Sequence, residues 1–318
     1  MPTNAAESVD RQRVCLSVCR FSSLSWAVLV ANQRLNMSEV PSNFTNDSAM
    51  MIAWERSLES ARPDALFHDP FAAALASNKG EALSEGFGAN AALFGLTDWP
   101  EFHKTWTSVR TKYIDDTVTR HASTGRFRQL VNLGAGMDTR AYRLPCYAAF
   151  TNGTFDVDME VVNGNKTKIF AEYLGAPKAH SGSVHNVNLD FLSEETSLAA
   201  VLGAIEAFDE SQPTVFICEG LIMYLGAEGK TKLIRDVSAV AAPGSVLVLQ
   251  FMEDAKNNAP QALSTEEAKQ RLGEGGWDEL QFSRFGDESL NFGRFPTARF
   301  PPNAGFSFVV AVKTSTRR

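Results

Sequence analysis

The sequence predicts an α/β fold built on a mostly parallel β-sheet, and three observations in its 318 residues favour this class. First, a strand-like run ends in the glycine turn Gly134-Ala135-Gly136. Second, three further strand-like runs follow the turn, and an acidic residue stands at or near the end of each. Third, amphipathic segments at 196–208 and 228–240 fit helices that connect such strands. Strands that alternate with helices are typical of a parallel sheet.

The first strand is expected at 130–133, directly before the glycine turn. Glycine lets the backbone approach a ligand closely, because it has no Cβ. Asp138 then opens a segment that can be helical, and the first N–H groups of a helix are free to bind a ligand. The sequence therefore predicts a nucleotide-binding turn. A structural turn with Asp138 as the N-cap is the alternative.

The spacing of the glycines argues against a dinucleotide as the ligand. The dinucleotide-binding fingerprint has a third Gly or Ala three positions after the second glycine. Thr139 occupies that position here. An NAD-binding oxidoreductase is therefore kept only as an alternative from another functional class.

The next three strands are expected to end in residues that bind the rest of a nucleoside. Asp158, at the end of the second strand, is placed to accept hydrogen bonds from both ribose hydroxyls. The third strand ends in Asp190-Phe191, an acid that suits an exocyclic amine and a ring that suits an adenine face. The fourth ends in Glu219. Because the carboxyl ends of parallel strands meet at one edge of a sheet, we predict a site there.

The remaining elements follow from hydrophobic patterning and turn residues. Helices on the N-terminal side, joined by a glycine-rich link at 80–95, are expected to form a cap on the substrate side. The run Asn163-Gly164-Asn165 is expected to delay the start of the helix after the second strand. In order, we expect helices at 48–61, 64–78 and 99–123, strands at 154–158, 183–191, 214–220 and 245–251, a helix at 264–273, and strands at 279–285 and 306–312.

Several motifs together resemble the S-adenosylmethionine-dependent methyltransferases of the leucine carboxyl methyltransferase family, most closely the branch of polyketide-type small-molecule O-methyltransferases. The resemblance covers residues 50–312. It rests on Arg62-Pro63-Asp64, Asp69-Pro70-Phe71-Ala72, Arg110-Thr111-Lys112-Tyr113-Ile114-Asp115-Asp116, Leu133-Gly134-Ala135-Gly136-Met137-Asp138-Thr139-Arg140, Asp156-Val157-Asp158, Asn188-Leu189-Asp190-Phe191, Glu219-Gly220-Leu221-Ile222-Met223-Tyr224-Leu225 and Pro243-Gly244-Ser245.

The resemblance implies a class I methyltransferase (Rossmann-like) fold: a seven-stranded, mostly parallel sheet with helices on both faces and an N-terminal helical cap. It implies a cap at 46–125 and an S-adenosylmethionine-binding domain at 126–318. It also implies how S-adenosyl-L-methionine is held. The matching positions are Gly134 and Gly136 for the methionine part, Arg110 for its carboxylate, Glu219 for its amino group, Asp158 for the ribose, and Asp190 and Phe191 for the adenine.

The chemistry of this cofactor implies methyl transfer to an oxygen, a carboxylate, of a small molecule. A carboxylate is already ionised at neutral pH and needs no base, so alignment is the main requirement. Tyr224 is the candidate to orient the substrate, and no histidine has the spacing of a catalytic or metal-binding motif. The alternatives are methylation of a protein C-terminal carboxylate and binding of the cofactor without catalysis.

Composition limits the classes of partner and the cellular locations that we expect for this protein. The net charge of −7 argues against nucleic acid as the general partner, and no segment is long and apolar enough for a membrane span. The four cysteines lack the spacing of a metal site or a disulfide framework, which favours a cytoplasmic location. Residues 1–45 are expected to be a disordered extension or a targeting peptide; an organellar location is the alternative if 1–36, which are rich in Arg and Ser, are a transit peptide. The oligomeric state is not predicted.

Overall fold

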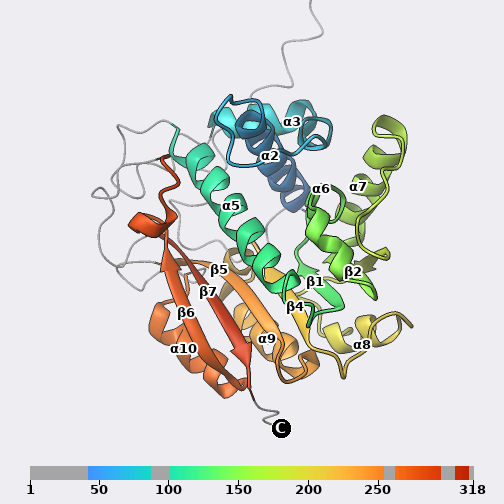
Figure 1. Cartoon of the computed structure of the whole chain (residues 1–318), viewed down its shortest axis with the longest axis vertical. Coiled ribbons are helices and arrows are strands. Elements are labelled where there is room, and N and C mark those ends of the chain that lie inside the picture. The colour runs from blue at the N-terminus through green and yellow to red at the C-terminus, as the bar shows by residue number, and fades with distance from the viewer. Residues whose placement is uncertain (1–41, 87–100, 254–261, 295–304, 315–318) are drawn as a thin grey trace, which may run out of the picture. The chain divides into compact units, whose positions relative to one another are not determined.

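The computed structural model describes residues 42–86, 101–253, 262–294 and 305–314. Seven strands form a sheet in the order β3-β2-β1-β4-β5-β7-β6 (Figure 1). Their bounds are β1 (Gln129–Leu133), β2 (Gly153–Asp158), β3 (Val184–Asn188), β4 (Thr214–Cys218), β5 (Val246–Glu253), β6 (Trp277–Arg284) and β7 (Gly305–Lys313). The first five strands pair in parallel, whereas β7 is antiparallel to both β5 and β6. The predicted seven-stranded, mostly parallel sheet is confirmed.

The strand order reverses between β1 and β4. From β1 the chain builds β2 and β3 on one side, and it then returns to add β4 and β5 on the other side. In open α/β sheets, ligands bind outside the carboxyl ends of the strands at such a reversal. The topology therefore places the candidate site at the ends of β1 and β4.

Helices cover both faces of the sheet because the central strands are apolar on both sides. Every residue of β1, β2 and β4 is buried, and β4 is a mostly apolar run, as expected for a strand covered on both faces, whereas β2 carries Asp156 and Asp158. One face packs against α8 (Leu198–Gly203), α9 (Gly226–Val240) and α10 (Thr265–Glu274). The other face packs against α5 (Phe102–Ala122) and the short helix η3 (Pro145–Ala149).

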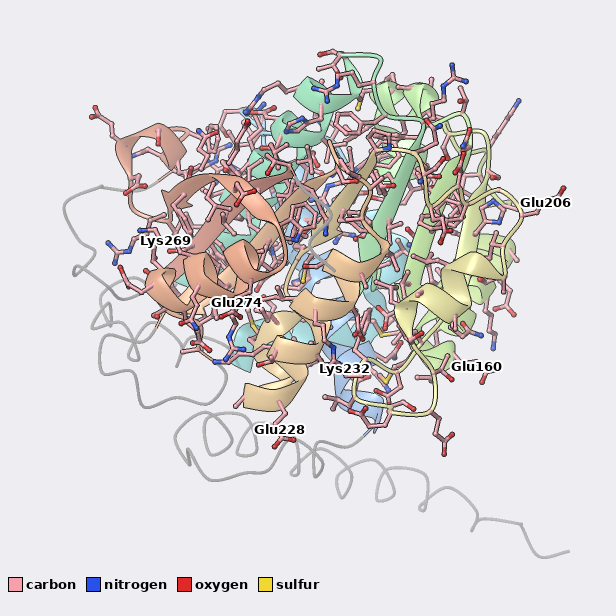
Figure 2. All side chains as sticks on the ribbon, turned by 90° about the horizontal axis from the view of Figure 1, so that it is seen from below. Glu160, Glu206, Glu228, Lys232, Lys269 and Glu274 are labelled. Atoms are coloured by element: carbon pink, nitrogen blue, oxygen red, sulfur yellow. The ribbon has the colours of Figure 1, made fainter. Side chains whose placement is uncertain are left out.

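The helix faces that point away from the sheet carry exposed charged side chains. In α9, Leu233, Ile234 and Val237 are buried against the sheet, whereas Glu228 is exposed. Figure 2 shows Glu228 at the periphery of the molecule, together with Glu160 at the start of α7 (Glu160–Tyr173). In the described part of the chain, no helix combines the length and apolar character that a bilayer span requires.

The N-terminal helices α2 (Ser42–Ser60) and α3 (Ala72–Gly86) pack together, and α5 joins them to the sheet (Figure 1). The aromatic ring of Trp106 in α5 stacks on Phe306 of β7 at 4.3 Å between centroids. The predicted N-terminal helices are present. The targeting-peptide prediction for residues 1–45 falls largely outside the described residues.

The prediction of a helix at 64–78 is wrong at its start, because α3 begins at Ala72. Pro70 disfavours a helical conformation in the residue before it. Side chains take over the backbone hydrogen bonds of the loop: Glu59 accepts from the N–H of Leu66, and Ser60 accepts from that of Asp69. The sequence between the two helices is therefore an ordered loop.

The expected delay of the helix after β2 is wrong, whereas the expected helix after the glycine turn is present but short. The helix after β2 begins at Glu160 without delay, because Asn163 donates hydrogen bonds to Val187 and Asn188 of β3 and so fits inside α7. The helix after the turn, α6 (Arg140–Arg143), has only four residues, since Pro145 forces the preceding residue into an extended conformation. A helix this short contributes little dipole to the site.

Candidate functional site

Three predicted residues meet at one edge of the sheet because of strand register. Leu133, the last residue of β1, pairs with Val157 of β2 and with Cys218 of β4. Gly134, Asp158 and Glu219 each follow directly after these paired residues. The parallel register thus brings together residues that are up to 85 positions apart in the sequence.

The glycine turn is closed by backbone hydrogen bonds and requires glycine. The N–H groups of Gly134 and Ala135 donate to the carbonyl oxygen of Val157, at 2.8 and 3.2 Å. Gly134 and Gly136 have φ values of 67° and 49°. A Cβ on Gly134 would lie 3.0 Å from the side chain of Leu221, so this position has neither the conformation nor the space for another residue.

Asp158 is buried at the edge, with 5% of its surface exposed. Its carboxylate accepts hydrogen bonds from the backbone N–H groups of Gly136 and Met159, both at 2.7 Å. Burial raises the pKa of Asp158 to about 6, although these N–H groups and the charge of Lys166 oppose the shift. Lys166 itself pairs with Asp156, at 2.8 Å. Asp158 thus lacks a directly bonded cation in the described part of the chain and keeps its capacity to accept hydrogen bonds from a ligand.

Arg110 of α5 faces Glu219 across the edge. Its Nε lies 2.6 Å from Glu219 Oε1, which makes an ion pair. The Nε–H does not point at a hydrogen-bond acceptor, so a buried donor remains without a partner in this part of the structure. Gly220, which follows Glu219, has a φ of 66°, and a Cβ there would be in ordinary contact with Arg110 Nη1 at 3.5 Å.

Arg140 of α6 connects the edge of the sheet to α5. Its Nη1 donates to Glu219 Oε2 at 2.7 Å and to Asp138 Oδ2 at 2.5 Å, and its Nε donates to Asp115 Oδ1 at 2.7 Å. Burial raises the pKa of Glu219, but the charges of Arg140 and Arg110 outweigh burial, so the net pKa is lowered. Glu219 is therefore ionised at neutral pH.

The ion pairs continue from Asp115 into the N-terminal helices. Arg143 holds Asp115 with two hydrogen bonds at 2.7 and 2.8 Å, and it lies 3.8 Å from Asp69. Arg56 of α2 donates to Asp69 and to the carbonyl oxygen of Met137 in the glycine turn. This set, which we call the edge network, comprises Arg56, Asp69, Arg110, Asp115, Asp138, Arg140, Arg143 and Glu219.

The edge network is electrically balanced, with four arginines and four acids, and it is almost entirely buried. Such a network fixes geometry more than it adds stability, since burying the charges costs desolvation energy. Removing one member leaves its partners uncompensated, which typically costs about 3–5 kcal/mol. The network thus fastens α2 and α5 to the glycine turn and to the end of β4.

The predicted adenine-binding residues lie beyond the end of β3. Asp190 is exposed and accepts a hydrogen bond from the N–H of Leu192 at 2.9 Å. Phe191 is 8% exposed and packs in the apolar core with the sheet. The N–H of Leu189 donates to the carbonyl oxygen of Asp158, which brings this loop next to β2. Contact of either residue with adenine stays a prediction.

Tyr224, the predicted substrate-orienting residue, lies in η4 (Ile222–Tyr224) directly after the fourth strand's turn. Burial raises its pKa, and a hydrogen bond with Ser48 of α2 and the charge of Arg110 oppose that rise. The tyrosine therefore stays protonated at neutral pH and can donate a hydrogen bond. Its role toward a substrate stays a prediction.

The histidines lie in other environments. His103 is held by Glu55 at 2.8 Å, and His185 stacks on Phe155 with ring centroids 5.0 Å apart. Among the described residues, no group of His, Cys, Asp or Glu has the arrangement of a metal site.

Sequence reasoning missed the role of Arg140 and its partners. The motif Asp138-Thr139-Arg140 was part of the resemblance, yet the motif alone does not show what the arginine binds. Its partners Asp115 and Glu219 are 25 and 79 positions away. An arginine four residues after a glycine turn, next to the strand ends, is the sequence signal that could have indicated acidic partners for Arg140.

Comparison with known proteins agrees with this geometry. The family model described as leucine carboxyl methyltransferase matches residues 49–238. A protein of Parafrankia sp. (strain EAN1pec), with the provisional name S-adenosyl-L-methionine-dependent methyltransferase, is 35% identical over 226 residues, or 70% of this chain and 66% of that protein. A Mycobacterium marinum protein with the same provisional name is 30% identical over 235 residues, or 73% and 75% of the two chains.

A solved structure supports the fold. The crystal structure of a DUF574 family protein from Streptomyces avermitilis has a TM-score of 0.53 and 16% identity, and the match covers 84% of this chain and 97% of that one. The predicted class I methyltransferase fold is confirmed. The chain belongs to the leucine carboxyl methyltransferase family, a family of S-adenosylmethionine-dependent methyltransferases.

Proposed function

We propose that this protein transfers a methyl group from S-adenosylmethionine to a carboxylate oxygen of a small molecule. The observation that carries the proposal is the row formed by Gly134, Asp158 and Glu219 at the carboxyl ends of three adjacent strands, with Arg110 facing Glu219 at 2.6 Å. When bound, the cofactor supplies a methyl group already activated on a sulfonium.

The residues of the edge fit the cofactor's groups. The Nε–H of Arg110 contacts Glu219 without a well-aligned hydrogen bond, which suits exchange for a carboxylate, a group that guanidinium groups bind well. Glu219, ionised and buried, suits an ammonium group. Asp158 accepts only two backbone hydrogen bonds and has lone pairs left for ribose hydroxyls.

A carboxylate as the methyl acceptor is consistent with the types of side chain near the strand ends. A phenol or alcohol usually needs a base to remove its proton, whereas a carboxylate does not. Tyr224 follows the turn after β4, and because its pKa is not below the ordinary tyrosine value, it keeps its proton at neutral pH and can donate a hydrogen bond. In the proposed reaction, the Tyr224 hydroxyl donates a hydrogen bond to one oxygen of the acceptor carboxylate. The other carboxylate oxygen then faces the methyl group.

The chain's contribution to the reaction is therefore alignment in a site that excludes water. Arg110 and Glu219 orient the amino-acid part of the cofactor, and Asp158 fixes the ribose. The edge network keeps these side chains from relaxing, because each charge has a buried partner. Holding two reactants in line converts an encounter into an effectively unimolecular step.

Two experiments test the proposal. Calorimetric titration with S-adenosylmethionine, S-adenosylhomocysteine and NAD should show binding of the first two alone; binding of NAD alone would overturn the assignment. An acceptor screen with labelled methyl groups should then yield products that release methanol in mild base, as methyl esters do. Base-stable products would indicate ethers and would refute the carboxylate. If the label appears in protein and not in small molecules, a protein C-terminal carboxyl group is favoured as the acceptor.

A further inference from the structure

The two oxygens of Glu219 have different surroundings. Oε1 lies 2.6 Å from Arg110 Nε, whose N–H is not aligned with an acceptor among the described residues, whereas Oε2 accepts a hydrogen bond from Arg140. A ligand that pairs with Arg110 can therefore replace Oε1 as its partner without breaking the bond to Arg140. One oxygen is held by the protein and the other is available for exchange.

Arg140 is fixed independently of Glu219. Its Nε donates to Asp115 of α5, and Asp138 takes hydrogen bonds from its Nη1 and from its backbone N–H. Its side chain is only 4% exposed. A lysine could not reproduce this arrangement, since it lacks the planar fork that directs hydrogen bonds to several acids at once.

We propose that Arg140 is a positioning residue that holds Glu219 so that its Oε1 faces the ammonium group of the cofactor's amino-acid part. Asp115 anchors Arg140 and thereby couples α5 to the cofactor. The inference rests on the proposed function, because the ligand of Glu219 comes from it. Arg140 acts only through Glu219 and touches no part of the ligand.

Two ligands separate this role from a general effect on folding. S-adenosylhomocysteine carries the amino-acid part, whereas 5′-methylthioadenosine has the same adenosine and thioether without it. In Arg140→Lys, affinity for S-adenosylhomocysteine should fall about tenfold or more, as expected when a hydrogen bond between charged groups is lost. Affinity for 5′-methylthioadenosine should stay unchanged. A general disturbance of the site would weaken both ligands in proportion.

A double-mutant cycle tests the route through Glu219. Glu219→Gln should lower the affinity for S-adenosylhomocysteine and leave the affinity for 5′-methylthioadenosine unchanged, as is expected for Arg140→Lys. The double variant should lose little more affinity for S-adenosylhomocysteine than Glu219→Gln alone, because Arg140 acts on the ligand only through Glu219. Fully additive losses would refute the proposal.

Arg143→Lys is the matched control. Arg143 lies in the same short helix and binds the same Asp115, but among the described residues it makes no hydrogen bond or ion pair with Glu219. This variant should keep the wild-type ratio of the two affinities. A ratio that shifts as much as in Arg140→Lys would mean that any disturbance of the network has the same effect, and the proposal would fail.

The experiment distinguishes the inference from the function beneath it. If the wild-type protein binds neither nucleoside, the proposed function is wrong. If it binds both and Arg140→Lys weakens them equally, only the inference is wrong. Should Arg140→Lys not fold, Asp115→Asn removes the anchor and leaves Glu219 intact. It must then lower affinity for S-adenosylhomocysteine alone, and an unchanged ratio would overturn the inference.

Discussion

Replacing Asp158 with asparagine is expected to stabilise the ligand-free protein at neutral pH and to weaken cofactor binding. Burial raises the pKa of Asp158 from 3.8 to about 6. The folded protein therefore holds a proton between about pH 4 and 6 that the unfolded chain has released. The free energy of unfolding must then fall as the pH rises through this window.

The magnitude follows from the two pKa values. A difference of about two in pKa corresponds to about 3 kcal/mol of lost stability at pH 7. Asparagine removes this cost but has one acceptor oxygen in place of two, so it loses the hydrogen bond from either Gly136 or Met159. Leaving that buried N–H unpaired costs about 1–3 kcal/mol, so a net stabilisation of about 0–2 kcal/mol at pH 7 is expected.

Urea denaturation of the ligand-free protein at pH 5 and pH 7.5 measures this effect. The advantage of Asp158→Asn over wild type should grow between the two pH values. Asp116→Asn, which removes an exposed carboxylate on α5, is the control. An advantage that does not change with pH would refute the role of ionisation. Wild-type affinity for S-adenosylmethionine should fall below about pH 6, where Asp158 becomes protonated.

Further substitutions test other parts of the site. Arg110→Ala should lower the affinity for S-adenosylmethionine about tenfold or more in calorimetry, because the cofactor's carboxylate loses the guanidinium proposed to bind it. An unaltered dissociation constant would remove Arg110 from the site. Gly136→Ala should cost about 1–2 kcal/mol of stability in urea denaturation, because φ is 49° there and the added Cβ meets α2 at 3.2 Å. Tyr224→Phe should raise the KM for the acceptor and leave S-adenosylhomocysteine binding unchanged; a loss of binding would assign Tyr224 to the cofactor. Trp106→Ala should lower the free energy of unfolding by about 3–5 kcal/mol, since the ring is buried and stacked.

Local patterns were sufficient to predict the sheet and most of its edge. Short strand-like runs that end in a glycine turn or an acid mark the central strands, and their last residues can be read directly from the sequence. Gly134, Asp158 and Glu219 were located in this way, and the parallel register aligns them. The predicted late start of the helix after β2 was wrong because a tertiary contact outweighs local helix propensity there. Asn163 fits inside α7 because β3 supplies its hydrogen-bond partners.

The fold class, the family and the residues at the strand ends follow from the sequence, because hydrophobic patterning and turn conformation depend on residues close together in the chain. How the charges combine follows from the tertiary structure. Arg140 meets Asp115 and Glu219 across 25 and 79 positions, and Asp158 acquires its raised pKa through burial. Ion pairing and desolvation depend on what surrounds a side chain in space, which no local pattern encodes.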